Sequence, residues 1–128
     1  ALELDERTEK PYFYRSQVET VRAIHRLLTG DLERHYTIAQ LSRQFSIPAT
    51  ALKACFKSVY GQPVGAYMRL FRMDRAALLL RQEPQASVAE IAGRVGYDSA
   101  SKFSAAFKEA KGKSPLEFRR ESRKNSSG

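Results

Sequence analysis

The hydrophobic and polar positions of this chain follow helical periodicity along most of its length. Apolar residues recur three and four positions apart from Ser16 to Gly30, from Thr37 to Phe45 and from Leu52 to Val59. The same spacing returns from Ser87 to Val95 and from Phe103 to Ala110. Because this spacing places apolar side chains on one face of a helix, the pattern predicts an all-α protein.

A unit of two short helices occurs twice in the sequence. TIAQLSRQFSIPATALKACFKSVYGQPVGAY (37–67) aligns with SVAEIAGRVGYDSASKFSAAFKEAKGKSPLEF (87–118), with one residue inserted in the second copy. Each copy begins with a capping box, formed by Thr37 with Gln40 and by Ser87 with Glu90. A duplicated helix pair indicates a function that is performed twice. Double-stranded DNA is the commonest ligand that repeats itself in this way.

The second helix of each copy has two distinct sides. Its apolar stripe predicts a buried face, with Cys55 as a small core residue: Leu52, Cys55, Phe56 and Val59, then Phe103, Ala106, Phe107 and Ala110. The opposite side is small, hydroxylic and cationic: Thr50, Lys53, Ala54 and Lys57, then Ser101, Ser104, Ala105 and Lys108. An ordinary solvated face, which is the simpler alternative, usually mixes Glu with Lys. The observed composition favours close approach to base edges and phosphates.

A long helix is predicted between the two copies, from Pro63 to Gln82. At 1.5 Å per residue, its twenty residues would span about 30 Å. Two apolar stripes are expected of a helix between two small lobes: Val64, Tyr67, Met68, Phe71, Arg75, Leu78 and Leu79, then Leu70, Met73, Ala77 and Leu80.

The positive charge is concentrated in one part of the chain. Residues 1–48 carry seven basic and seven acidic residues, whereas residues 49–128 carry fifteen basic and seven acidic residues and so account for the net charge of +8. This distribution indicates a surface that faces a polyanion. An anionic membrane is a weaker candidate, because no stretch opposes an apolar aromatic face to a Lys-rich face. No apolar run is long enough to span a membrane.

The second copy resembles the signature of the AraC/XylS family of bacterial transcription regulators. Residues 91–119 carry I-A-x-x-V-G-Y, F-x-x-x-F-K and G-x-S-P-x-x-F-R, and the resemblance covers roughly residues 18–120. It implies seven helices in a homeodomain-like tandem, with two helix-turn-helix subdomains joined by a long linker helix. Each subdomain would place a recognition helix in one of two successive major-groove segments, about 34 Å apart.

The resemblance also implies site residues. Those expected to contact bases are Thr50, Ala51, Lys53 and Ala54 in the first recognition helix, and Ser101, Lys102, Ser104 and Ala105 in the second. Those expected to contact phosphates are Thr37, Lys57, Ser99 and Lys108. Positions 54 and 105 depart from many relatives, because Ala stands where Arg or another long polar side chain often sits. Bidentate Arg–guanine readout is therefore absent there, and we expect more reliance on phosphates and DNA shape.

The domain organisation follows from these elements. We expect an N-terminal linker (1–16), a first helix-turn-helix subdomain (17–62), the linker helix (63–82), a second subdomain (83–120) and a disordered tail (121–128). The chain begins at Ala1 without Met, and we expect it to be the C-terminal module of a longer regulator. An effector or dimerisation domain would precede it. With one cysteine, Cys55, no internal disulfide forms, which fits the cytoplasm.

Other functions are disfavoured by the sequence. No nucleophile–base pair, paired carboxylates, metal-ligand spacing or Gly-rich phosphate loop is visible, so we expect no catalysis, cofactor or metal. His25 falls on an apolar stripe and is expected to be a packing residue, and His35 falls in a loop. RNA binding is disfavoured because no aromatic strand motif is present. Binding to RNA polymerase would be an addition to DNA binding.

Overall fold

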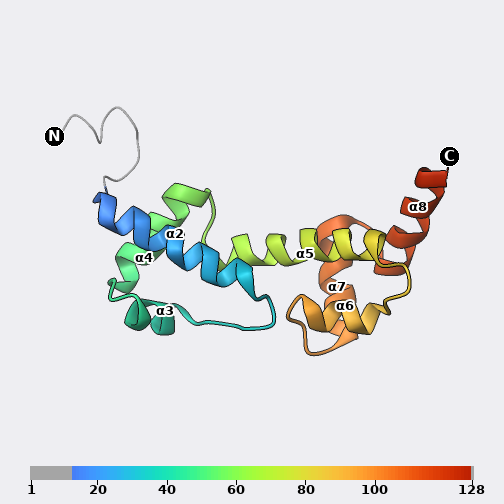
Figure 1. Ribbon diagram of the computed structural model, residues 1–128, viewed down its shortest axis with the longest axis horizontal. Coiled ribbons are helices and arrows are strands. Elements are labelled where there is room, and N and C mark those ends of the chain that lie inside the picture. The colour runs from blue at the N-terminus through green and yellow to red at the C-terminus, as the bar shows by residue number, and fades with distance from the viewer. Residues whose placement is uncertain (1–12, 128) are drawn as a thin grey trace. The chain divides into compact units, whose positions relative to one another are not determined.

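The computed structural model describes residues 13–127, which form seven α-helices and contain no strand (Figure 1). The predicted all-α fold class is confirmed. The helices are α2 (Arg15–Gly30), α3 (Ile38–Gln44), α4 (Ala49–Tyr60), α5 (Val64–Gln82), α6 (Val88–Arg94), α7 (Ala100–Lys111) and α8 (Pro115–Ser127).

These helices form two compact units. Among the described residues, unit 1 comprises 13–31 and 35–68, and unit 2 comprises 32–34 and 69–127. Each unit contains one copy of the repeated helix pair, α3 with α4 in unit 1 and α6 with α7 in unit 2. The division falls inside α5, so the first turn of that helix belongs to unit 1 and the remainder to unit 2.

The core of unit 1 lies where α2 and α3 pack against α4 (Figure 1). The predicted stripe of α4 is buried at Leu52, Cys55 and Phe56, whereas Val59 is only half-buried. Burial raises the pKa of the Cys55 thiol, as expected for a core residue. Full burial of a large apolar side chain such as Leu52 or Phe56 contributes about 1.5–3 kcal/mol to the stability of the fold. The buried partners of the stripe are Val21, Ile24 and Leu28 of α2 and Leu41 of α3.

An aromatic cluster joins α2, α4 and the first turn of α5 in unit 1. The His25 ring stacks on Tyr60, with centroids 4.3 Å apart and an interplanar angle of 10°. His25 Nε2 lies 2.8 Å from the Tyr67 hydroxyl oxygen, a hydrogen-bonding distance. Burial, followed by the positive charge of Arg26, lowers the pKa of His25. His25 is therefore a packing residue of unit 1, as the sequence pattern predicts.

The core of unit 2 is built on Phe103 and Phe107, both fully buried on α7. Phe107 contacts Phe118 of α8 edge-on, with ring centroids 5.4 Å apart. Ala110, expected in the same buried stripe, is exposed. It lies in the last turn of α7, beyond these aromatic contacts. The other buried side chains of this core are Met73, Ala76, Ala77, Leu79 and Leu80 of α5 and Ile91, Ala92 and Val95 in and after α6.

The stripes predicted for α5 are only partly correct. Leu70 and Leu78 are exposed, at 46% and 36%. Arg75 is also exposed, and its guanidinium lies 5.5 Å from the centroid of the Phe71 ring. Arg72, which the apolar pattern left out, is instead buried. It donates hydrogen bonds to the carbonyl oxygens of Leu32 and Val95, and these bonds compensate for burying a charged group.

The structure differs from the expected tail at 121–128, because α8 continues to Ser127. Nothing between Pro115 and Ser127 breaks a helix, and Glu121 forms an ion pair with Lys113. A capping box that was not expected from the sequence begins this helix, and in it the side chains of Ser114 and Glu117 each accept a hydrogen bond from the other residue's backbone amide. Residue 128 and residues 1–12 of the expected linker lie outside the described residues.

Arg119 of α8 fixes the chain at the end of α5. Its guanidinium donates to the carbonyl oxygens of Leu80, Glu83 and Ala86 at 3.0, 3.1 and 2.8 Å. The last carbonyls of a helix lack partners within that helix. One side chain on α8 therefore satisfies the final turn of α5 and the loop that follows.

We predict that Gly96→Ala destabilises the protein by at least about 2 kcal/mol. The left-handed backbone alone costs an L residue roughly 1–2 kcal/mol. Gly96 has φ +93°, and a Cβ there would also collide with Arg72 Nη1 and the carbonyl oxygen of Leu32. The control is Gly93→Ala, where a Cβ meets open space within α6. This control should be neutral or stabilising by up to about 1 kcal/mol. Urea denaturation measures both free energies of unfolding, and equal effects would contradict the role assigned to Gly96.

We predict that His25 makes unfolding pH-dependent. Because burial lowers its folded-state pKa, the unfolded chain binds the proton more readily. The stabilisation is present above the unfolded value of about 6.5 and is lost as the pH falls toward the folded value. In chemical denaturation between pH 5 and 8, His25→Phe should remove this loss, and His35→Gln in the loop should retain it. An unchanged pH profile in His25→Phe would contradict the assignment.

Candidate nucleic-acid interface

In unit 1, a capped helix and a strained turn lead into α4. Thr37 Oγ1 accepts a hydrogen bond from the Gln40 amide at 3.0 Å, and Gln40 Oε1 accepts one from the Thr37 amide at 2.8 Å. The predicted capping box is therefore present at the start of α3. In the turn, Ser46 has φ +53°, a conformation that Gly adopts more easily. The Ser42 hydroxyl donates to the carbonyl oxygen of Ile47 at 2.6 Å and supports this turn.

In unit 2, the corresponding segment has the same plan with different residues. Ser87 and Glu90 form the second predicted capping box at the start of α6. Gly96 replaces Ser in the turn, and Ser99 caps α7 by accepting a hydrogen bond from the Lys102 amide at 2.9 Å. At α4 the residue before the helix is Pro48, which makes no side-chain cap. The first amides of α7 are therefore partly satisfied by a side chain, and those of α4 are not.

The candidate base-contacting residues lie on the outer sides of α4 and α7. On α4, Thr50, Lys53 and Ala54 are exposed, and Ala51 is half-buried at the edge of the core. On α7, the exposed residues are Ser101, Lys102 and Ala105, and Ser104 is half-buried. Within each unit, these residues lie opposite the buried stripe of their own helix.

The candidate phosphate-contacting residues are of two kinds: lysines on α4 and α7, and hydroxyl residues at the starts of α3 and α7. Lys57 and Lys108 are exposed, one turn beyond Lys53 and Ser104. Thr37 is exposed and Ser99 half-buried, and both hydroxyl oxygens accept the capping bonds described above. Each hydroxyl keeps its own hydrogen for donation to an anion.

One interaction at this surface was not expected from the sequence. The Lys102 ammonium lies 3.9 Å from a carboxylate oxygen of Asp98, and both side chains are highly exposed. Exposed pairs of this kind contribute at most about 1 kcal/mol, so a phosphate can displace the carboxylate. In the described part of unit 1, by contrast, Lys53 and Lys57 have no carboxylate within ion-pair distance.

Residues 13–127 also bear on metal and membrane binding. No group of three or more His, Cys, Asp or Glu side chains is placed to hold a metal ion in that range. No helix among these residues is both long and apolar enough to cross a membrane.

A helix-turn-helix domain family matches residues 41–121, which include both recognition helices. The chain belongs to the AraC/XylS-type helix-turn-helix family. One curated relative is a Streptomyces lividans protein named as an AraC-like transcription regulator. It is 38% identical over 93 residues, which cover 73% of this chain and 30% of the relative. The transcriptional activator RhaR of Enterobacter sp. (strain 638) is 32% identical over 97 residues, covering 76% of this chain and 34% of the relative.

Solved structures share this AraC/XylS-type fold. The C-terminal domain of AraT, a response regulator from Geobacillus stearothermophilus, has a TM-score of 0.73 and 30% identity, covering 79% of this chain and 84% of that chain. The DNA-binding domain of AdpA, solved in complex with a target DNA, has a TM-score of 0.76 and 22% identity. The match covers 83% of this chain and 95% of that chain. At that identity, the likeness is one of fold. This chain spans about a third of the length of the curated relatives above.

Proposed function

We propose that this chain is the DNA-binding module of a bacterial transcription regulator and that it binds double-stranded DNA with a preference for sequence. The observation that carries the proposal is the repeated outer face of α4 and α7. Each face is small, hydroxylic and cationic, and each is held outward by the buried stripe behind it. Family membership supports the same conclusion, as does the fold shared with a DNA-bound relative.

In the proposed complex, α4 and α7 enter successive major-groove segments of one duplex, because the repeat supplies the same kind of face twice. Lys53 and Lys102 have the reach to donate to the guanine O6 and N7 atoms. The Ala54 and Ala105 methyl groups are small enough to contact thymine methyls. With Ala at both positions, sequence preference depends more on DNA shape than it would with Arg.

Phosphate contacts are proposed at the margins of the same faces. The ammonium groups of Lys57 and Lys108 project there from exposed positions. Thr37 and Ser99 stand at helix starts, where backbone amides and the helix dipole favour anions. These contacts fix the position of the protein on the duplex and carry no base information directly.

Three wider statements are part of the proposal. A ligand-sensing or dimerisation domain precedes this module in the full-length regulator, as suggested by relatives about three times as long as the matched region. The regulator contacts RNA polymerase and acts at the nucleoid in the bacterial cytoplasm. This is expected because the relatives are named as a transcription regulator and a transcriptional activator. Its role is binding and not catalysis.

The proposal is tested by selecting bound sequences from a random duplex library. We predict two enriched segments whose centres are about 10–10.5 base pairs apart, one helical turn of DNA. Recovering one enriched segment would limit base readout to one recognition helix. Binding without any enrichment would contradict sequence preference, and the absence of duplex binding would contradict the function itself.

Single substitutions separate the two kinds of contact. Lys57→Ala should weaken binding to all duplexes alike and reduce the slope of log K against log salt by about 0.9, because one phosphate contact is lost. Lys53→Ala should change preference at one base position, where a good contact discriminates by about 1–3 kcal/mol. The matched control is Arg22→Ala, an exposed cation on α2, which should leave binding nearly unchanged. Fluorescence anisotropy over a salt series measures all three, and a similar loss in the control would indicate unspecific charge attraction.

A further inference from the structure

An exposed ion pair stands at the start of α7, on the face through which unit 2 is proposed to read DNA. The Lys102 ammonium lies 3.9 Å from a carboxylate oxygen of Asp98, and the two side chains are 74% and 85% exposed. Asp98 directly precedes Ser99, the residue that caps α7. The N-terminal residues of a recognition helix are those that contact base edges. The pair therefore presents a hydrogen-bond donor and an acceptor, side by side, where a base pair would lie.

Unit 1 has no acidic group at the corresponding place. The N-cap residues Pro48 and Ser99 correspond to each other, so Asp98 is the residue inserted in the second copy of the repeat. Residues 34–73 contain neither Asp nor Glu. Three exposed cations of α3 and α4 form no ion pair with another described residue: Arg43, Lys53 and Lys57. Such cations attract the phosphates of any duplex, whatever its sequence.

In unit 2, most cations of the repeated segment are already paired. Residues 85–113 carry five basic residues, and Lys108 alone of the five is in none of the ion pairs of this unit. Glu109 adds an exposed carboxylate in the last turn of α7. Attraction to phosphates is therefore expected to be weaker here than in unit 1, and binding by α7 to depend more on base contacts. The four paired cations are Arg94, Lys102, Lys111 and Lys113.

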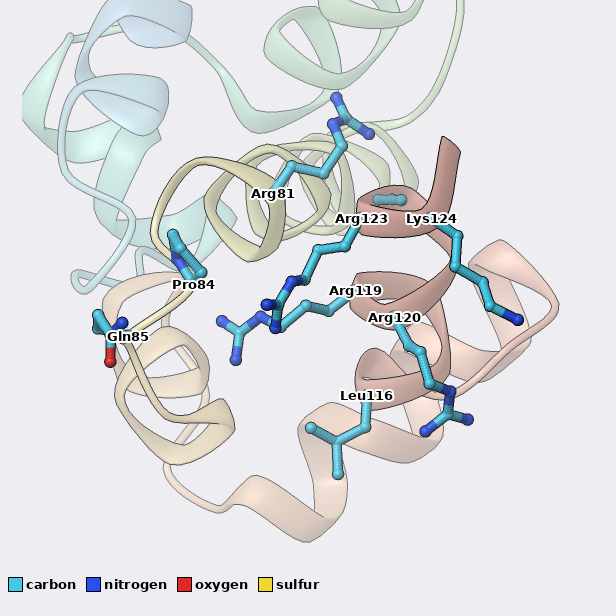
Figure 2. A pocket seen from close by; sticks show the side chains of 9 residues that line it. Arg81, Pro84, Gln85, Leu116, Arg119, Arg120, Arg123 and Lys124 are labelled. Carbon is cyan, nitrogen blue, oxygen red and sulfur yellow. The ribbon is translucent and has the colours of Figure 1, made fainter. Parts of the chain in front are cut away.

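A second group of cations in unit 2 lies on α8, away from Asp98. Figure 2 shows Arg119 and Arg123 reaching from α8 toward Pro84 and Gln85, beyond the end of α5. Arg119 donates to three backbone carbonyls, and α8 contacts the buried side of α7 through its Phe118 ring. Among the described residues, Lys102 is therefore the cation that lies within ion-pair distance of Asp98.

A G·C base pair offers the pattern that complements this donor and acceptor. In the major groove, guanine presents the acceptors O6 and N7, and its partner cytosine presents the N4 amino donor. Lysine binds the two guanine atoms, and an Asp carboxylate accepts from the cytosine amino group. An A·T pair gives lysine the single O4 acceptor of thymine and adds the thymine methyl group. Phosphates and base acceptors repel a carboxylate, so the same group disfavours sequences that leave it without a donor.

We propose that Asp98 and Lys102 together read one G·C base pair, and that Asp98 thereby raises the sequence selectivity of unit 2. The proposal rests on the DNA-binding function proposed above and deepens it. Because the ion pair is exposed and weak, little stability is lost when its two groups turn to a base pair. Lys102 then donates to guanine, and Asp98 accepts from cytosine.

The test is selection of bound sequences from a random duplex library by the intact protein and three variants. For the unaltered protein, we expect a G·C pair at one position of one enriched segment. Asp98→Asn should exchange this pair for A·T, because an Asn amide binds the N6 and N7 atoms of adenine. Asp98→Glu should keep G·C, since it retains the carboxylate. The control, Glu109→Gln, removes an equal charge from the exposed surface of α7 and should leave the selected sequence unchanged.

Fluorescence anisotropy measures the size of the effect on duplexes that differ at this one position. Exchanging G·C for A·T should weaken binding of the unaltered protein by about five- to 100-fold, the range for one good base contact. For Asp98→Asn this ratio should invert. Both Asp98→Asn and Glu109→Gln should bind an unselected duplex about two- to fivefold more tightly, because each loses one charge that repels phosphates. Circular dichroism verifies that the variants are folded.

Three results would count against these expectations in different ways. An unchanged base preference in Asp98→Asn would overturn the proposal and leave the proposed DNA binding intact. An equal change of preference in Glu109→Gln would also overturn it, because the effect would then be one of net charge. Failure of the unaltered protein to bind any duplex would contradict the proposed function itself, and this proposal with it.

Discussion

Burial of the apolar stripes on α4 and α7 determines which side chains these helices present to solvent. Phe56 on α4 and Phe103 and Phe107 on α7 are completely buried. Rotating either helix to present another face would expose these rings to water. The exposure of each ring would lower the stability of the fold by about 1.5–3 kcal/mol. Exchanges on the outer face usually cost less than about 0.5 kcal/mol. The core therefore fixes the orientation of the recognition surface, and the residues on that surface are left to set its chemistry.

The two turns that aim these helices carry unequal constraints. In unit 1, Ser46 adopts a positive φ, and only the backbone conformation favours Gly there. In unit 2, Gly96 adopts a positive φ and also leaves the space through which Arg72 reaches the carbonyl oxygen of Leu32. Burial lowers the pKa of Arg72, which reflects the cost of holding a charge in this place. The second turn is thus tied to α5 and to the segment at 32–34, and it tolerates fewer substitutions than the first.

Local patterns in the sequence were sufficient to predict those structural features that depend on residues close together in the chain. The capping boxes at Thr37 and Ser87 and the two-sided character of α4 and α7 follow from spacings of three or four residues. Arg72 and Arg119 were missed because their partners lie 23 to 40 residues away. Apolar periodicity does not register a charged side chain that is buried by bonding to carbonyls. The pattern also overestimated the burial of Leu70, Leu78 and Ala110.

The absence of Arg at positions 54 and 105 shifts the balance of contacts in the proposed DNA complex. Ala cannot make the bidentate guanine contact, so in the proposed complex we expect less of the binding free energy to come from base identity and more from phosphate contacts. Phosphate contacts weaken steeply with salt, and they discriminate poorly between sites. The proposed complex is therefore expected to be sensitive to salt and to draw part of its sequence preference from the shape of the DNA.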